Sequence, residues 1–287
     1  MVDIYQKIWK ADQENNGIKA FRSKDEIDEE AKSTGYVIVD EQIEGEREHQ
    51  LLPEVFIPDE KMKTYLLAEK LFNNYTLDQT KPETNTASES EEVQELLEAI
   101  VKSQPMLVAR EYVSERSGRE VSENRWWRLL EEIWFEPFDN GRNQDLSGFE
   151  HVLVGEQKQG KLQGYHFWYK YYFDEHFLFN EQEWDLIDVL QLEGKPEKTP
   201  DSVTLSYIVR IFDYEAKQFR QLTKPIGGFW VGTSVEGLMA LGTVRFIAEA
   251  LAPKVGTING HVYRLEMFRS PNDRNMRTFF PIYERPA

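Results

Sequence analysis

The sequence predicts an α+β protein, with a mainly helical N-terminal region followed by antiparallel β-sheets that carry packed helices. Two observations support this prediction. Up to about residue 138, apolar residues recur at three- and four-residue spacing, as on one face of a helix. Beyond residue 150, runs rich in Val, Tyr, Phe and Trp are separated by turn-forming residues. We expect a helical region over 1–120 and a second region, with the chemistry, over 121–287.

The N-terminal region is expected to be mostly helical from residue 4 to about 71, and the segment KMKTYLLAEKLFNNY shows the helical period clearly. The segment DQTKPETNTASESEE (78–92) has no large apolar residue, which predicts an exposed loop or linker. Two helices should follow, in VQELLEAIVKSQ and SENRWWRLLEEIWFEPF. In the second, Ser122 suits the N-cap position and Pro137 ends the run.

The second region is expected to begin with a hairpin, because residues 151–156 and 165–173 have β-type composition and QKQGKLQG between them favours a turn. The aromatic run within 168–173 is assigned to the core of a strand rather than to base stacking. The segment SVTLSYIVRIF alternates apolar and polar residues, which is typical of a half-buried strand. A strand pair should frame Lys224, Ser234 should cap the helix VEGLMALGTVRFIAEAL, and HVYRLEMF and RTFFPIY should pair antiparallel.

Composition limits the possible functions. The 287 residues include no cysteine, which excludes disulfides, thiolate nucleophiles and cysteine-based zinc sites and fits a reducing compartment. The N-terminal residues lack the pattern of a secretory signal, and no stretch approaches the roughly 18 apolar residues of a membrane span. We therefore expect a cytoplasmic protein without a membrane partner.

The net charge of −17 at first argues against a nucleic-acid ligand, because phosphate binding usually needs a basic surface. Its distribution weakens that argument. Residues 1–125 hold 16 Lys+Arg against 28 Asp+Glu, a net charge of −12, whereas residues 126–287 hold 18 against 23, a net charge of −5. A locally positive cleft in the second region is therefore compatible with the sequence.

Two histidines, His151 and His166, lie on the two expected hairpin arms, where side chains on one face can converge. RNA cleavage needs a base for the ribose 2′-hydroxyl proton and an acid for the departing 5′-oxygen, and two imidazoles can serve because they titrate near neutrality. A nearby lysine would stabilise the extra negative charge of the transition state.

Two other interpretations stay open for these histidines. A lone histidine on a strand is more often a packed structural residue than a catalytic one. A metal site with Glu150 and Glu156 is the second alternative, although neighbours 150 and 151 would point to opposite faces of a strand. His176 and His261 are assigned structural or surface roles.

The phrases SGFEHVLVGE, GYHFW and KPIGGFWVGTSVEGLMAL resemble, in order and spacing, those of the EndoU family of endoribonucleases. The resemblance can be followed from about Trp126 to Tyr283. It implies that His166 is the base, His151 the acid and Lys224 the residue that stabilises the transition state. The implied products carry a 2′,3′-cyclic phosphate and a 5′-hydroxyl.

The same resemblance implies supporting roles for Glu150, Glu156 and Thr278, and a substrate-binding role for Thr278 as well. A hydrogen-bonding role for the two glutamates is a close alternative. The resemblance also implies stimulation by Mn²⁺ or Ca²⁺, which the mechanism itself does not require. At two substrate-binding positions the chain departs from its relatives. Gly228 replaces a serine that hydrogen-bonds uracil, and Phe280 replaces a stacking tyrosine, so we expect uridine preference with some loosening.

Three hypotheses follow for the function. The first is an endoribonuclease that cleaves single-stranded RNA at uridines, and retention of the two histidines and the lysine favours it. The second is an RNA-binding or regulatory protein of the same fold, which the acidity and Gly228 would favour. The third is a metal-dependent hydrolase, which cleavage in EDTA would exclude.

Overall fold

The computed structural model describes residues 3–41, 50–83, 86–139, 145–179, 181–192, 199–247 and 252–287. In this part of the chain the helices are α1 (Ile4–Gln13), α2 (Ala31–Thr34), α3 (Asp59–Lys70), α4 (Ala87–Ile100), α5 (Gln104–Ser117), α6 (Glu123–Trp134), α7 (Trp168–Glu175) and α8 (Val235–Ile247), with single turns η1 (Lys24–Glu26), η2 (Leu71–Asn73) and η3 (Glu150–Val154). None of these helices is long and apolar enough to cross a membrane.

The strands form two main sheets and three small ones. The five-stranded sheet has the order β10-β11-β12-β7-β6, and a three-stranded sheet has the order β13-β14-β15. Their bounds are β6 (Glu156–Lys158), β7 (Lys161–Gln163), β10 (Ile187–Leu192), β11 (Ser202–Asp213), β12 (Gln218–Trp230), β13 (Val255–Ile258), β14 (His261–Arg269) and β15 (Met276–Pro286). The small sheets pair β1 (Lys19–Phe21), β2 (Tyr36–Ile38) and β3 (Glu54–Phe56); β4 (Phe138–Asp139) and β5 (Asp145–Leu146); and β8 (Phe177–Phe179) and β9 (Gln182–Trp184).

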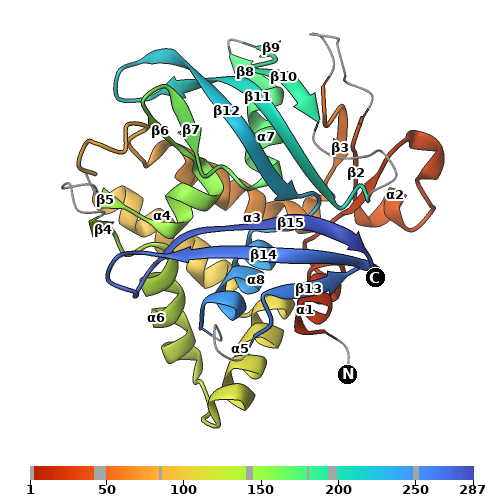
Figure 1. Cartoon of the computed structure of the whole chain (residues 1–287), viewed down its shortest axis with the longest axis vertical. Coiled ribbons are helices and arrows are strands. Elements are labelled where there is room, and N and C mark those ends of the chain that lie inside the picture. The colour runs from red at the N-terminus through yellow and green to blue at the C-terminus, as the bar shows by residue number, and fades with distance from the viewer. Residues whose placement is uncertain are drawn as a thin grey trace.

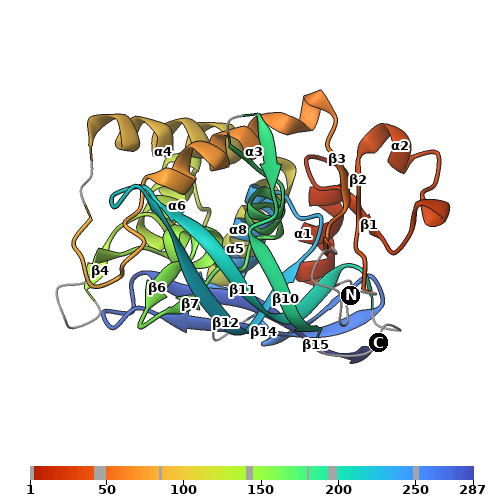
Figure 2. The same ribbon diagram turned by 90° about the horizontal axis from the view of Figure 1, so that it is seen from above.

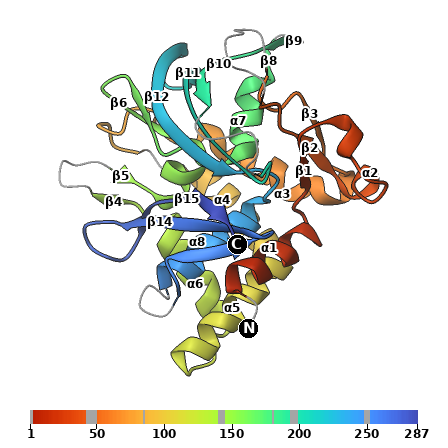
Figure 3. The ribbon, with the colours of Figure 1, turned by 45° about the vertical axis from the view of Figure 1, so that its right-hand side comes forward.

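The α+β prediction is confirmed, and the N-terminal helices lie against the C-terminal sheets (Figure 1). Helix α1 packs on α5, α8 and β13, and α5 also packs on α8. Figure 2 shows α3 and α4 along one side of the molecule and β14 and β15 along the other, and Figure 3 shows α1 and α5 beside α8. One hydrophobic core runs through both regions, and the division near residue 120 stays a prediction.

Several predicted N-terminal elements are confirmed and others need correction. Helices α3, α4 and α6 form where expected, and the Ser122 side chain caps α6 by accepting from the Arg125 N–H. The expected linker 78–92 is only partly irregular, because Thr86 and Glu89 form a capping box that starts α4 at residue 87. Residues 84–85 lie outside the described residues. The expectation of mostly helical structure from residue 4 to about 71 is wrong at 19–21, 36–38 and 54–56, which form the small sheet β1-β2-β3. Helix α5 was not predicted.

Most predicted C-terminal strands and the helix cap are confirmed, but Lys224 lies within the single continuous strand β12 and is not framed by a strand pair of its own. Strand β11 buries every second side chain over most of its length, and it pairs with β12 and β10. The β11–β12 register shifts next to Lys224, between Leu205 and Tyr207, which marks a bulge in the ladder there. The Ser234 hydroxyl accepts from the Gly237 N–H at 3.0 Å and so caps α8, and β14 pairs antiparallel with β15.

The predicted hairpin arms at 151–156 and 165–173 are wrong. Only the short pair β6–β7 is a hairpin; the first arm is mostly the helical turn η3 and most of the second is helix α7. Trp168, Tyr169 and Tyr171 are buried, so their assignment to the core is confirmed. A short helix with so many buried aromatic residues lacks a polar face. Its sequence therefore shows no helical period, and its aromatic composition is typical of a strand.

Candidate active site

His151 lies in η3, a turn of π-helix, in which the main-chain hydrogen bond spans five residues instead of four. The Gly155 N–H donates to the Glu150 carbonyl at 2.7 Å, five residues back, and the His151 N–H donates to the Ser147 carbonyl at 3.1 Å. The turn ends at Gly155, whose φ of +87° favours glycine. Isolated π-turns are frequent at functional sites because they aim a side chain in a direction that a regular helix cannot.

The segment from Gly164 to His166 joins β7 to α7 and lies against η3. The Tyr165 N–H donates to the His151 carbonyl at 2.8 Å, and the His166 N–H donates to the Val152 carbonyl at 2.6 Å. At Gly164 a Cβ would lie 1.7 Å from the His151 carbonyl oxygen, and φ is +62°, so only glycine fits. The two histidines therefore converge as expected, although main-chain bonds between a turn and a loop bring them together instead of strand arms.

His166 is buried, and the structure fixes the orientation of its ring. Its Nδ1 lies 2.9 Å from the Gly228 carbonyl oxygen, and its ring stacks on Phe280 with 4.5 Å between centroids and 18° between planes. Burial, followed by the positive charge of Lys224, lowers the pKa of His166 well below 6.5. Since a carbonyl only accepts, Nδ1 carries the proton and the lone pair resides on Nε2.

His151 has a different partner. Its Nδ1 lies 2.5 Å from Oε1 of Glu156, a carboxylate with no exposed surface. This contact orients the ring, and among the described residues no hydrogen bond to its Nε2 is formed. Because Glu150 and His151 lie in a helical turn, the expectation that they point to opposite faces of a strand is wrong.

Glu150 is also buried, and its Oε2 accepts from the Ser147 N–H at 3.3 Å. Burial raises the pKa of Glu150 well above 4.5, and the charge of Glu156 raises it further. The environment therefore favours the protonated form of this carboxyl group, so Glu150 and Glu156 have different electrostatic roles.

Lys224 reaches the site from β12, and its Nζ donates to the Gly164 carbonyl at 2.5 Å. Burial lowers the pKa of Lys224 to about 8, an effect that Glu156 opposes. Lys224 and His151 both contribute positive charge that lowers the pKa of His166, so the three groups lie within electrostatic reach of one another. At neutral pH the ammonium group is largely protonated.

The predicted substrate-binding residues surround His166. Gly228 supplies the carbonyl that holds its ring, and Phe280 covers one ring face. A Cβ added at Gly228 would meet its nearest neighbours at 3.4 Å, an ordinary contact, so the backbone there leaves room for a Cβ. Thr278, on the same strand as Phe280, is buried, and its hydroxyl has no hydrogen-bond partner in the described part of the chain.

The described residues do not fit a divalent metal centre. They contain no group of three or more His, Asp or Glu side chains placed to hold an ion. Among the described residues near the histidines, the oxygens without a hydrogen-bond partner include one each of Glu150 and Glu156 and the Thr278 hydroxyl, whereas Mn²⁺ and Ca²⁺ take six or more ligands, chiefly oxygens. His176, held by Glu183 and the Leu52 carbonyl, and His261 take no part in this cluster.

His151, His166 and Lys224 lie within electrostatic reach of one another, and comparison with known proteins decides the family. Residues 1–281 match the family model of Endoribonuclease XendoU. The chain belongs to the XendoU family. The predicted membership is therefore confirmed, and the match includes the N-terminal region, where the resemblance in sequence phrases is looser.

Curated relatives support the XendoU assignment and have related activities. The chain is 27% identical over 232 residues to the poly(U)-specific endoribonuclease-B of Xenopus laevis, covering 79% of this chain and 75% of that protein. It is 30% identical over 222 residues to the uridylate-specific endoribonuclease C of Danio rerio, covering 76% and 67%. The solved structure of XendoU, a splicing independent snoRNA processing endoribonuclease, has the same fold, with a TM-score of 0.72, 23% identity and coverage of 99% and 96%.

Two features of the site had no prediction from the sequence. The sequence indicates only a turn at Gly164. In the structure its carbonyl accepts from Lys224, and the absence of a side chain leaves room for the His151 carbonyl. The stacking of Phe280 on His166 joins segments 114 residues apart in the sequence (280 − 166). The role of Gly164 could have been suspected from its place in the phrase GYHFW, two residues before His166. The stacking of Phe280 on His166 has no signal in the sequence.

Proposed function

We propose that this XendoU-family protein cleaves single-stranded RNA at uridines by attack of the ribose 2′-hydroxyl on the adjacent phosphorus. One observation carries the proposal. Both histidines engage protein acceptors through Nδ1, no described residue hydrogen-bonds either Nε2, and Lys224 lies within electrostatic reach of His166. An acid, a base and a cation around one point are the groups that this reaction needs.

His166 serves as the base in this proposal. Its lowered pKa keeps the ring neutral at pH 7, and the Gly228 carbonyl selects the tautomer with the lone pair on Nε2. Nε2 takes the proton of the 2′-hydroxyl while the 2′-oxygen bonds to phosphorus. The stacked Phe280 holds the ring plane fixed during this transfer.

His151 serves as the acid. It donates its Nε2 proton to the 5′-oxygen as the bond between phosphorus and that oxygen breaks, which gives a 2′,3′-cyclic phosphate and a 5′-hydroxyl. The Glu156 carboxylate at Nδ1 complements the positive charge of a doubly protonated ring. Lys224, as an ammonium group, stabilises the added negative charge on the phosphoryl oxygens.

The proposed preference for uridine comes from the relatives, which are described as poly(U)-specific or uridylate-specific. In this chain the base would stack on the exposed part of Phe280, while Gly228 offers only main-chain groups for hydrogen bonding. We therefore propose weaker discrimination among bases than a serine at 228 would give. Stimulation by Mn²⁺ or Ca²⁺ stays a prediction, and no step of the mechanism uses an ion.

The test is cleavage of oligoribonucleotides that contain one uridine, in EDTA and then in Mn²⁺, with mass analysis of the ends. We expect cyclic-phosphate ends after uridine in both buffers and no cleavage when that uridine lacks its 2′-hydroxyl. Cleavage of the 2′-deoxy substrate would contradict the mechanism. Binding without cleavage in either buffer would favour the RNA-binding alternative.

A further inference from the structure

A buried polar cluster, unused by the mechanism above, lies directly behind the two histidines. The Tyr165 hydroxyl donates to Oδ2 of Asp174 at 2.5 Å, and Nζ of Lys170 contacts the same oxygen at 2.5 Å. The tyrosine hydroxyl also lies 3.2 Å from the Lys170 carbonyl oxygen. All three side chains are at least 95% buried. A tyrosine, a carboxylate and an ammonium group thus share one oxygen inside the protein.

Tyr165 connects this cluster to the active site through its backbone. It lies between Gly164, whose carbonyl holds Lys224, and His166, and its own N–H donates to the His151 carbonyl. Its φ is +65°, a conformation that is uncommon for a bulky residue and needs support from its surroundings. The positions of His151, His166 and Lys224 therefore all depend on the segment Gly164–His166.

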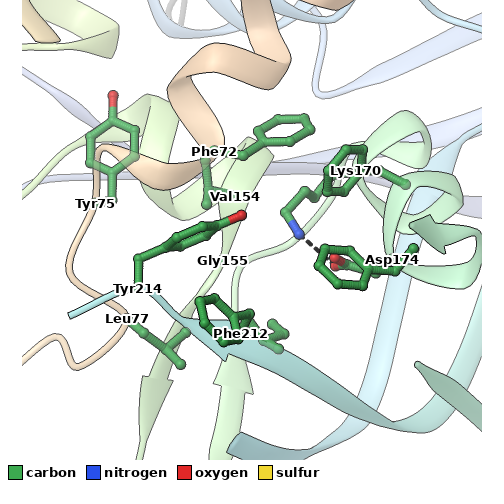
Figure 4. A pocket seen from close by; sticks show the side chains of 12 residues that line it. Phe72, Tyr75, Leu77, Val154, Gly155, Lys170, Asp174, Phe212 and Tyr214 are labelled. Atoms are coloured by element: carbon green, nitrogen blue, oxygen red, sulfur yellow. Dashed lines mark hydrogen bonds and ion pairs between the residues drawn. The ribbon is translucent and has the colours of Figure 1, made fainter. Parts of the chain in front are cut away.

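The cluster is held tightly from the other side. Lys170 and Asp174 are one turn apart on α7, and Nζ of Lys170 lies 5.4 to 5.6 Å from the ring centroids of Phe72, Tyr165 and Phe173. Figure 4 shows Lys170 and Asp174 facing each other at a small cavity of about 30 Å³, which Val154 and Gly155 also line. A Cβ at Gly155 would lie 2.9 Å from the Tyr165 side chain, so this ring packs closely on the end of η3.

We propose that Tyr165, Asp174 and Lys170 form an anchor that positions the Gly164–His166 segment, and through it His166 and Lys224, for RNA cleavage. The inference rests on the proposed function. The anchor works because hydrogen bonds to an ionised carboxylate are stronger than neutral ones, and because electrostatic interactions are stronger in a buried environment than in water. The three residues are positioning residues and do not contact the RNA.

Two neighbouring tyrosines argue against a purely structural role. Tyr171 and Tyr207 are fully buried in the same core, and their rings pack against each other with 5.5 Å between centroids. Neither hydroxyl has a hydrogen-bond partner among the residues that the structure describes. This core therefore accommodates a buried tyrosine whose hydroxyl makes no hydrogen bond. The hydrogen bonds of Tyr165 are thus not needed for core packing, and we assign them to holding the Gly164–His166 segment in place.

The experiment compares Tyr165→Phe with Tyr171→Phe in the full chain. Both changes remove one buried hydroxyl, but only the first removes a hydrogen bond to Asp174. For Tyr165→Phe we expect kcat on a uridine oligonucleotide to fall about tenfold or more, with KM within about twofold, because small displacements of catalytic groups reduce the rate strongly. Tyr171→Phe should retain wild-type kcat. Equal kcat values for the two variants would overturn the proposal.

A second measurement does not depend on cleavage. NMR titration of the histidine rings should show that the His166 titration midpoint moves upward, toward 6.5, in Tyr165→Phe, because the loosened segment lets water reach the ring. Tyr171→Phe should leave it in place. An unchanged His166 midpoint in Tyr165→Phe would overturn the anchor even if RNA cleavage were absent from every variant, and absence of cleavage by the wild type would separately refute the proposed function.

A double variant completes the design. If Tyr165 and Asp174 act as one unit, Tyr165→Phe combined with Asp174→Asn should be no slower than the slower single variant. Multiplication of the two single losses would contradict a shared anchor. Should Asp174→Asn fail to fold, the Tyr165→Phe and Tyr171→Phe comparison decides the question alone, since both variants keep the size of the side chain.

Discussion

The surroundings of His166 and of His151 differ in the group that faces Nδ1. At His166 this group is the neutral carbonyl of Gly228, and the ring is buried against Phe280. At His151 it is the carboxylate of Glu156. A buried ring beside a neutral acceptor is held in its uncharged form, whereas a ring beside a carboxylate has a counter-charge for its proton. Two histidines can thus have opposite proton-transfer roles because their Nδ1 atoms face different groups.

Removal of either imidazole should lower the cleavage rate more than any other change. His166→Ala, His151→Ala and the companion change Lys224→Ala should each lower cleavage by about a hundredfold or more, because each removes a group that acts in the same transition state. Single-turnover rates on a uridine oligonucleotide provide the measurement. His261→Ala, outside the cluster, is the control. A rate within a few-fold of wild type for any of the three would withdraw that residue's role.

Loss of the carboxylate beside His151 should have the next largest effect. Glu156→Gln keeps an oxygen acceptor for Nδ1 but removes its charge, and we expect kcat to fall about ten- to a hundredfold, as when a partner of an active-site histidine is lost. The charge of Glu156 also raises the pKa of Lys224. Its removal should lower that pKa below about 8, so the alkaline limb of the rate profile should move to lower pH. An alkaline limb that stayed in place would contradict the assigned contact.

The wild-type pH profile should reflect the same two environments. Activity should be lost on acidification only below pH 6.5, as His166 becomes protonated, and on the alkaline side near pH 8, as Lys224 loses its proton. One unit above that pKa, at about pH 9, the rate should be about tenfold lower if only the ammonium form is active. Lys224→Arg should remove the part of the alkaline limb that Lys224 contributes, because guanidinium stays charged, and any limb that remains would reflect the acid, His151. Retention of the whole limb in Lys224→Arg would assign it to another group.

The smallest effect is expected at Gly228, where the carbonyl serves His166 and the side chain is missing. Gly228→Ser should improve discrimination of uridine from cytidine by about fivefold, the value of one net hydrogen bond of about 1 kcal/mol. Relative kcat/KM values on matched oligonucleotides provide the measurement. Gly228→Ala, which adds only the Cβ that fits at 3.4 Å, is the control. Equal gains on both bases would show that the serine acts on the fold and not on recognition.

The sequence was sufficient for elements whose pattern is local. The alternation in β11 and the caps at Ser122 and Ser234 predicted strand and helix boundaries correctly. The candidate residues were found through phrases shared with a family, and the structure brings His151, His166 and Lys224 together.

What the sequence could not give depends on contacts distant along the chain. The buried aromatic residues of α7 conceal its helical period, and the π-turn at His151 depends on Gly155 packing against Tyr165. The roles of the two histidines are set by Gly228 and Glu156, one of them 62 residues away from its partner. No local rule of propensity predicts such a pairing.

The most direct test of the account measures the two histidine variants on a substrate that does not need an acid, a uridine 3′-phosphate ester of nitrophenol. Its leaving group departs without a proton, so His151→Ala should return to within about tenfold of the wild-type rate, whereas His166→Ala should remain about a hundredfold slower or more. The opposite pattern would exchange the two roles. Equal losses on both substrates would contradict the division into acid and base that the two environments indicate.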